Sequence, residues 1–115
     1  TKIIFNTEVY DTASKYDPAT NYRWTPGVGA VVLYLQVYFE SPEANKFMQP
    51  AIYKNGALLK MTRTVPPGTV ATAQGFMFID LSDADDYYEA YCYNSATSTD
   101  TASIANSHFM GFRIS

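Results

Sequence analysis

Four aspartates within one short polar segment are the densest group of side chains in this sequence that could do chemistry. They are Asp80, Asp83, Asp85 and Asp86. Hard cations such as Ca²⁺ require several oxygen ligands, but the spacing does not match an EF-hand loop, which places ligands at alternate positions and ends on a distal Glu. We therefore predict a solvated acidic turn and no cofactor. Asp83, Asp85 and Asp86 are the candidate ligands if calcium binds.

The remaining candidates for catalysis are a single histidine, His108, and a single cysteine, Cys92. Cys92 lies in an alternating apolar stretch, where a lone cysteine is usually a small core residue, so a cysteine–histidine pair is not expected. The sequence contains no Gly-x-Ser-x-Gly elbow and no glycine pattern for phosphates or dinucleotides. We interpret His108 as a strand-edge or interface residue and predict that the protein is not an enzyme.

Charge and hydropathy exclude two classes of partner. The net charge is −3, and the 8 basic residues are spread singly along the chain. A nucleic-acid interface needs a basic stripe that neutralises phosphates, so we expect no nucleic-acid partner. No stretch is apolar for the roughly 18 residues of a membrane span, so we expect no membrane insertion.

Tyrosine is the most informative excess, with 10 residues in the chain. Two alternating segments carry tyrosines on a second face that should be polar in a monomeric sandwich. Tyrosine suits a surface that buries a large ring while its hydroxyl still finds a partner, as interfaces do. An alternative is that some of these rings only cap the core. The residues that we predict to line an assembly interface are Tyr34, Tyr38, Tyr87, Tyr91 and Tyr93.

Short alternating runs bounded by turn residues predict that one all-β domain spans residues 1–115. Aromatic and β-branched residues favour strands, and no segment shows sustained helical periodicity. The best strand has Val31, Leu33, Leu35, Val37 and Phe39 on one face. We count seven to ten strands, including Lys2–Val9, Val31–Glu40, a hairpin over Met48–Lys60, Thr72–Leu81, Tyr87–Asn94 and Phe109–Ser115. Ser95–Ser107 is expected to be a loop, with room for a short strand near Ile104.

The hairpin expected over Met48–Lys60 turns at Asn55-Gly56. Asn-Gly is the strongest short hairpin signal because both central residues of a type I′ turn need positive φ.

Four groups of residues, taken in order, resemble the complement C-one-q globular head, a relative of the tumour-necrosis-factor jelly rolls. The family opens with Phe, Asn or Asp, and an aromatic residue at fixed spacing, then has an aromatic strand before a Pro-Gly-Val turn. A Tyr-Lys-Asn-Gly hairpin follows, and the family ends on Phe-x-Gly-Phe. The matching residues here are Phe5, Asp11 and Tyr16, then Trp24 with Pro26 to Val28, then Tyr53 to Gly56, and finally Phe109, Gly111 and Phe112.

The resemblance implies a two-sheet antiparallel jelly-roll sandwich of about ten strands that forms a homotrimer around a threefold axis. Members of this family sit at the ends of stalks, fibres or secreted trimers, which implies an extracellular, cell-surface or virion-surface location. The Ser-, Thr-, Ala- and Asn-rich loops suggest a bacterial or phage member. The interface tyrosines would then line the threefold axis.

Three functions remain open from the sequence. The first is the trimeric binding head of a fibre, adhesin or tail appendage that recognises a surface receptor or glycan through its loops. The second is a trimerisation cap that binds no ligand, and the third is a monomeric carbohydrate-binding module. The loop residues that we expect to contact a ligand are Glu43, Asn45, Arg63, Thr69, Asn94, Thr99 and Asp100.

Overall fold

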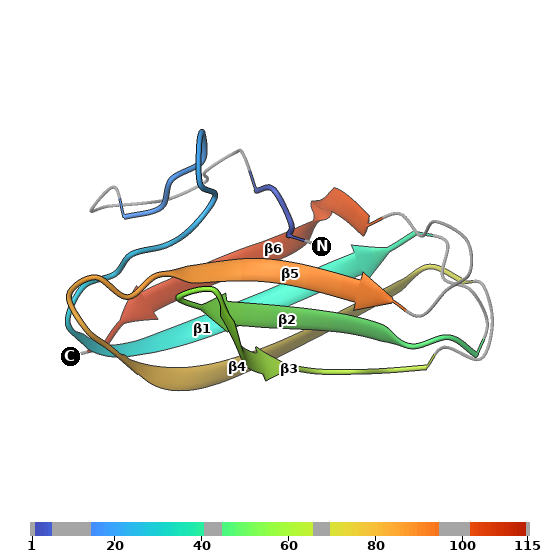
Figure 1. Ribbon diagram of the computed structural model, residues 1–115. Helices are drawn as coiled ribbons and strands as arrows, with labels where there is room; N and C mark the ends of the chain where they lie inside the picture. Colours follow the sequence, from blue (N-terminus) through green and yellow to red (C-terminus); the bar gives the residue numbers. More distant parts are fainter. Residues whose placement is uncertain (1, 6–14, 41–44, 66–69, 95–101, 115) are drawn as a thin grey trace.

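A computed structural model gives the architecture of the chain and describes residues 2–5, 15–40, 45–65, 70–94 and 102–114 (Figure 1). These residues contain six strands and no helix. The strands are β1 (Gly29–Phe39), β2 (Met48–Lys54), β3 (Ala57–Met61), β4 (Thr72–Ser82), β5 (Tyr88–Asn94) and β6 (Ala102–Arg113). The described part of the chain has no helix long and apolar enough to cross a membrane.

The strands form two three-stranded sheets with the orders β4-β1-β6 and β3-β2-β5. All strand pairs are antiparallel. In Figure 1 the β3-β2-β5 sheet lies in front of the β4-β1-β6 sheet. The prediction of an all-β, two-sheet antiparallel fold is confirmed.

The expected number of about ten strands is not seen in the described residues. Segments that could have been further strands form only isolated bridges, which join Lys2 to Tyr91 and Trp24 to both Tyr16 and Tyr88. The carboxylate of Asp17 accepts backbone N–H bonds at 2.9–3.0 Å from the residues at 19–21, which folds this part of the chain into a turn.

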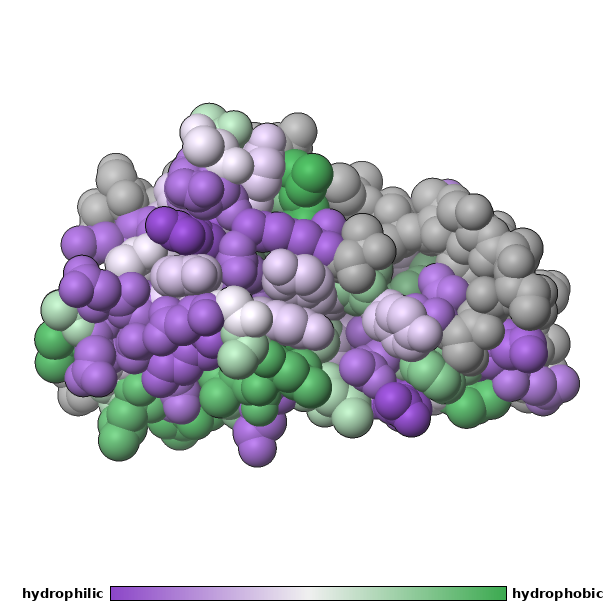
Figure 2. Space-filling model, viewed as in Figure 1, coloured by the Kyte–Doolittle hydropathy of each residue, from purple (hydrophilic) through white to green (hydrophobic). Residues whose placement is uncertain are grey.

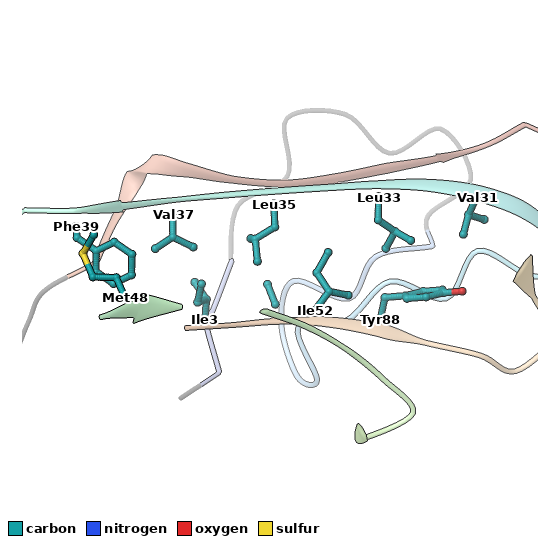
Figure 3. Close-up of a cluster of buried hydrophobic side chains, with 10 residues drawn as sticks. Ile3, Val31, Leu33, Leu35, Val37, Phe39, Met48, Ile52 and Tyr88 are labelled. Carbon is teal, nitrogen blue, oxygen red and sulfur yellow. The ribbon is translucent and has the colours of Figure 1, made fainter. Parts of the chain in front are cut away.

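The core lies between the two sheets and follows the predicted alternation of β1. Val31, Leu33, Leu35, Val37 and Phe39 are at most 1% exposed. Figure 3 shows these side chains pointing toward residues of the other sheet. The partners across the core that are fully or almost fully buried are Met48, Ile52, Tyr88 and Ala90. Burial of such apolar surface from two facing sheets is the main source of stability for a sandwich.

The predicted hairpin is confirmed between β2 and β3. Asn55 and Gly56 adopt φ values of 52° and 84°, the positive values that a type I′ turn requires. The Asn55 amide also donates to Asp86 Oδ1 at 2.7 Å and accepts from the backbone N–H of Tyr87 at 3.0 Å. The turn is therefore tied to the segment that leads into β5.

The final strand differs from the prediction, because β6 begins at Ala102 and includes residues that we expected to lie in a loop. Its early part pairs with the end of β1, as in the pair Tyr38–Ser103. The register shifts between Gln36 and Tyr38, and there the backbone N–H of Tyr38 donates to Ser107 Oγ at 3.0 Å. Pairing with a long neighbouring strand outweighs the weak strand propensity of a Ser- and Ala-rich segment.

Candidate functional site

The outer side of the β4-β1-β6 sheet carries the largest set of exposed apolar side chains among the described residues. The exposed fractions are 67% for Met77, 64% for Ile79, 75% for Leu81, 57% for Met110 and 54% for Phe112. Val32 and Tyr34 of β1 lie between them and are half-buried. We call these seven residues the apolar face: Val32, Tyr34, Met77, Ile79, Leu81, Met110 and Phe112.

Strand register explains why these side chains gather. Val32 of β1 pairs with Ile79 on one side and with Phe112 on the other. Tyr34, two residues on, pairs with Met77 and Met110. Directly paired residues project from the same side of a sheet, so the two triplets form adjacent rows. Between the rows lies a shallow, wholly apolar groove of about 270 Å³ lined by Val32, Tyr34, Met77, Met110, Gly111 and Phe112.

The apolar face lacks ionised side chains over the strands that the structure describes. Its few polar groups bond locally: the Tyr34 hydroxyl donates to Gln36 Oε1 at 2.8 Å. None of the outward-facing positions is Asp, Glu, Lys or Arg. These positions are Ala30, Val32, Tyr34, Gln36, Tyr38, Ala73, Gly75, Met77, Ile79, Leu81, His108, Met110 and Phe112.

The extent of this surface is at the high end for a monomer. The five most exposed side chains together offer on the order of 500 Å² of apolar surface, the upper range for the largest patch on a typical monomeric protein. A standard protein–protein interface buries about 800 Å² on each partner. The apolar face is therefore large enough to form the centre of such an interface.

The outer side of the opposite sheet, β3-β2-β5, is different. It carries rings that contact one another and one arginine, and we call it the aromatic–polar face: Phe47, Gln49, Tyr53, Arg63, Tyr91 and Tyr93. The rings of Tyr53 and Tyr91 stack with their centroids 4.1 Å apart, and those of Phe47 and Tyr93 lie 5.6 Å apart. Figure 2 views this side of the molecule, where hydrophilic and intermediate colours prevail and green side chains gather mainly along the lower margin.

Charged side chains also hold the aromatic–polar face in place. The Arg63 guanidinium lies 4.0 Å from the centre of the Phe47 ring, and the Arg23 guanidinium lies 4.1 Å from that of Tyr87. Lys2 forms an ion pair with the largely buried Glu89. Burial, followed by the nearby Glu89 charge, raises the pKa of Tyr91. This face is organised by contacts within the chain, in contrast to the apolar face.

The five tyrosines predicted to share one interface do not lie on one surface. Tyr34 and Tyr38 project from the outer side of the β4-β1-β6 sheet, whereas Tyr91 and Tyr93 project from the outer side of β3-β2-β5. Tyr87 lies beside the second group, just before β5. The alternation within each strand was predicted correctly. The assumption of a common face was wrong because the two strands belong to different sheets.

Two of the four aspartates take part in a polar cluster that joins the two sheets. Lys54 of β2 donates to Asp80 of β4 at 2.8 Å and lies 3.3 Å from Asp86. The hydroxyl of the buried Tyr88 donates to the same oxygen of Asp80 at 2.7 Å. We call Lys54, Asp80, Asp86 and Tyr88 the inter-sheet cluster.

The pKa values of the inter-sheet cluster reflect these contacts. Burial opposes ionisation of Asp80, but hydrogen bonds from Lys54 and Tyr88 outweigh it and lower its pKa. The backbone N–H of Asp83 and the amide of Asn55 lower the pKa of Asp86. Burial, followed by the bond to Asp80, raises the pKa of Tyr88 to about 12. Each of these groups is thus a hydrogen-bond or ion-pair partner of another member of the cluster.

The candidate calcium ligands are not assembled into a cation site. Asp86 directs its carboxylate at Asn55, Lys54 and the backbone N–H of Asp83, while Asp83 and Asp85 are exposed. Within the ranges given above, no group of three or more His, Cys, Asp or Glu side chains is placed to hold a metal ion. The prediction of a solvated turn holds for Asp83 and Asp85, whereas Asp80 lies in β4 and, with Asp86, belongs to the inter-sheet cluster.

Three of the predicted ligand residues fall on described parts of the chain. Arg63 and Asn94 lie at the same end of the β3-β2-β5 sheet, because Met48 pairs with Asn94 and forms a bridge with Thr64. Asn45 is exposed just before this end, with φ 64°. The others, Glu43, Thr69, Thr99 and Asp100, lie outside the described residues.

His108 and Cys92 lie on different sheets of the sandwich. His108 is exposed on β6, which is an edge strand, and pairs with Gln36. Cys92 packs against the core, and burial raises the pKa of its thiol, so it is a poor nucleophile. No catalytic pair forms from these two side chains.

Residues of the motif that resembles the complement head come together in space. The ring of Phe109 lies 6.2 Å from those of Phe5 and Tyr16, and the Tyr16 hydroxyl donates to the carbonyl of Phe5 at 3.0 Å. A Cβ on Gly111 would stand 2.4 Å from the ring of Trp24. The start and end of the chain therefore pack together through these residues.

The apolar face was predicted only in part: Tyr34 was among the predicted interface residues, but its neighbours on β4 and β6 were not, although a signal was present. Both Phe76/Phe78 and Met77/Ile79 are apolar, so β4 is hydrophobic on its two sides. A strand with one solvated side should alternate with polar residues, and this one does not.

Comparison of the chain with protein-family models and with curated proteins gave no match.

Proposed function

We propose that this chain is the head domain of a homotrimeric binding protein, assembled by burial of the apolar face against neighbouring copies. The observation that carries the proposal is that Met77, Ile79, Leu81, Met110 and Phe112 are each more than half exposed on one sheet. Methionine and aromatic residues are enriched in interface cores, and ionised residues are depleted there. The apolar face has this composition.

The proposed occupant of the apolar face is a second copy of the chain. The exposed apolar area is large enough to form the centre of what one partner buries in a standard interface. In a threefold assembly the apolar faces of the three copies would meet around the axis, each copy placing one part of its apolar face against another part of the next copy's, and the ring closes after three. The apolar surface of all three copies is then removed from water.

The finer fold that supports a trimer is a jelly roll. In an eight-stranded jelly roll the last six strands are divided between two sheets in the order seen here, with β1 central in one sheet and β2, paired with β3, central in the other. The bridge from Trp24 to Tyr88 lies beside β5, where an earlier strand of a jelly roll would pair. The packing of Phe5, Tyr16 and Phe109 also supports the resemblance to the complement head.

Assembly would give the binding function its strength. Three weak sites held on one rigid body raise avidity without any stronger single contact. The aromatic–polar face lies on the sheet opposite the apolar face and stays open when the apolar face is covered.

The test is the oligomeric state of the Met110→Glu variant, measured by light scattering after size exclusion. Met110 lines the apolar groove, and a buried carboxylate without a partner is strongly unfavourable there. We expect a trimer for the wild type and a monomer for this variant. The matched control is Leu58→Glu, since Leu58 is similarly exposed at 51% but lies on the other sheet. A wild-type monomer would overturn the proposal and favour the monomeric module.

The same measurement separates the two groups of tyrosines. Tyr34→Glu places a charge on the apolar face, and Tyr91→Glu places one on the opposite sheet. We expect the first variant to dissociate and the second to remain trimeric. If Tyr91→Glu dissociates and Tyr34→Glu remains trimeric, the interface lies on the aromatic–polar face instead.

A further inference from the structure

Four side chains at one end of the aromatic–polar face form a small preorganised surface: Phe47, Gln49, Arg63 and Tyr93. Gln49 and Tyr93 are directly paired across β2 and β5, so they project from the same side of the sheet. Phe47 lies just before β2 and packs against Tyr93, and Arg63 lies over Phe47. Aromatic, amide and guanidinium groups are thus placed next to one another.

The guanidinium of Arg63 is fixed in direction although the side chain is exposed. Its Nε and Nη2 donate to Gln49 Oε1 at 3.1 and 2.8 Å, and its plane is held over the Phe47 ring. These contacts use one edge of the guanidinium. The Nη1 donors on the other edge make no hydrogen bond to a described protein group, and the residue is exposed. Arginine normally loses much side-chain entropy on binding, and a guanidinium already held in place loses less.

Tyr93 supplies a ring surface beside these donors. It is 56% exposed, and its hydroxyl makes no hydrogen bond within the described residues. The neighbouring Phe47 ring, with centroids 5.6 Å apart and planes tilted by 41°, limits how Tyr93 can turn. An exposed aromatic ring held in position provides contact area at low conformational cost.

We propose that this surface binds a sugar ring of a glycan. A pyranose has an apolar C–H surface that packs on an aromatic ring and a rim of hydroxyls that bond to planar donors and acceptors. Tyr93 offers the ring and a hydroxyl, while Arg63 and the Gln49 amide offer donors at its side. A nucleic-acid base would also stack on Tyr93, but the net charge of −3 disfavours a polyanion.

The inference deepens the proposed binding role by naming its ligand class and site, and it can be tested apart from assembly. The site lies on the sheet opposite the apolar face, so trimer formation would leave it accessible. A monomeric Met110→Glu variant should bind a single sugar with the same intrinsic affinity. Only the avidity for a multivalent glycan depends on the trimer.

The experiment is a titration of the isotope-labelled protein with cellohexaose, xylohexaose, mannohexaose and chitohexaose, followed by amide NMR shifts. We expect at least one of these sugars to shift the signals of Gln49, Arg63 and Tyr93 with a dissociation constant of about 1 mM or lower. Tyr93→Ala and Arg63→Ala should each weaken binding about tenfold or more, whereas Tyr93→Phe should retain it within about threefold because the ring remains.

The matched control is Tyr53→Ala, which removes a ring from the same sheet outside the proposed site and should leave the dissociation constant unchanged. Amide signals elsewhere in each variant report that the fold is retained. The proposal is overturned if none of the four sugars shifts these signals at about 10 mM, or if Tyr93→Ala binds as well as the wild type. Failure to form a trimer would overturn the assembly proposal and leave this one standing.

Discussion

At some positions in this chain the neighbouring side chains limit which residue can fit. Gly111 is the clearest case, because a Cβ at this position would lie 2.4–2.9 Å from three atoms of the Trp24 ring. The ring of Trp24 also packs beside Tyr88, with centroids 6.0 Å apart, so it cannot retreat freely into the core. A glycine is therefore needed for close packing and not for backbone freedom.

We predict that Gly111→Ala lowers the free energy of unfolding by about 1–3 kcal/mol, because the added methyl overpacks a filled site. Chemical denaturation with fluorescence detection measures this effect. A double-mutant cycle with Trp24→Ala provides the control. In the Trp24→Ala background, Gly111→Ala should lower the free energy of unfolding much less, because the ring is absent. An equal cost in both backgrounds would show that the contact with Trp24 is not the cause.

The elements of the sandwich are joined by polar contacts as well as by the apolar core. The inter-sheet cluster links β2 to β4 through Lys54 and Asp80, and it links β4 to β5 through Asp80 and Tyr88. Lys54 also donates to the carbonyl of Leu81 at 2.8 Å. The hairpin turn at Asn55 is tied to the same region through Asp86. These contacts fix how the two sheets meet along one margin.

This cluster predicts how stability depends on pH at the alkaline end. The pKa of Tyr88 is raised from 10.0 to about 12 in the folded protein, so the unfolded chain loses this proton first. The stability that this group contributes is complete below pH 10 and is lost as the pH rises toward 12. Denaturation at several pH values should show a steeper alkaline decline for the wild type than for Tyr88→Phe.

At neutral pH, Tyr88→Phe should lower the free energy of unfolding by about 1–2 kcal/mol, because it removes a hydrogen bond to an ionised carboxylate. Tyr93→Phe is the control, since its hydroxyl has no described hydrogen bond, and it should keep the wild-type alkaline decline. Identical alkaline profiles for wild type and Tyr88→Phe would rule out the assigned role. At the acid end the sign is opposite: the pKa values of Asp80 and Asp86 are lowered, so their contribution is lost as the pH falls below about 3.8.

At the scale of the whole molecule, the two outer sides of the sandwich are chemically unlike. One is the apolar face, and the other is the aromatic–polar face with its own contacts. A molecule that buries the apolar face and exposes the aromatic–polar face would place each surface in the environment that suits its chemistry. This asymmetry is the physical basis of our proposal that one small domain combines assembly with ligand binding.

If the apolar face is buried between copies, folding and assembly are linked by mass action. We predict that the thermal unfolding midpoint of the wild type rises with protein concentration. The midpoint of Met110→Glu should be lower and independent of concentration, while Leu58→Glu should behave as the wild type does. Calorimetry over a hundredfold range of concentration, ~1–100 µM, measures this, and a midpoint for the wild type that does not move would contradict burial of the face.

Much of the fold could be predicted from the sequence because local chemistry determines it. The alternation in Val31 to Phe39 placed those side chains in the core, and Asn55-Gly56 placed the hairpin turn. Each of these signals depends only on residues near in sequence, through the two-residue period of a strand or the positive φ of a turn. The acidic turn and the core position of Cys92 followed in the same way.

The tertiary structure decided which strands share a sheet, and this determined both candidate surfaces. Tyr34 and Tyr91 each point away from the core, as their strands predicted, but they lie on opposite sides of the molecule. The alternation within a strand shows which side chains point away from the core, and it carries no information about the neighbouring strand. Pairing between residues distant in sequence brought Met77 and Met110 to either side of Tyr34 and placed Arg63 over Phe47.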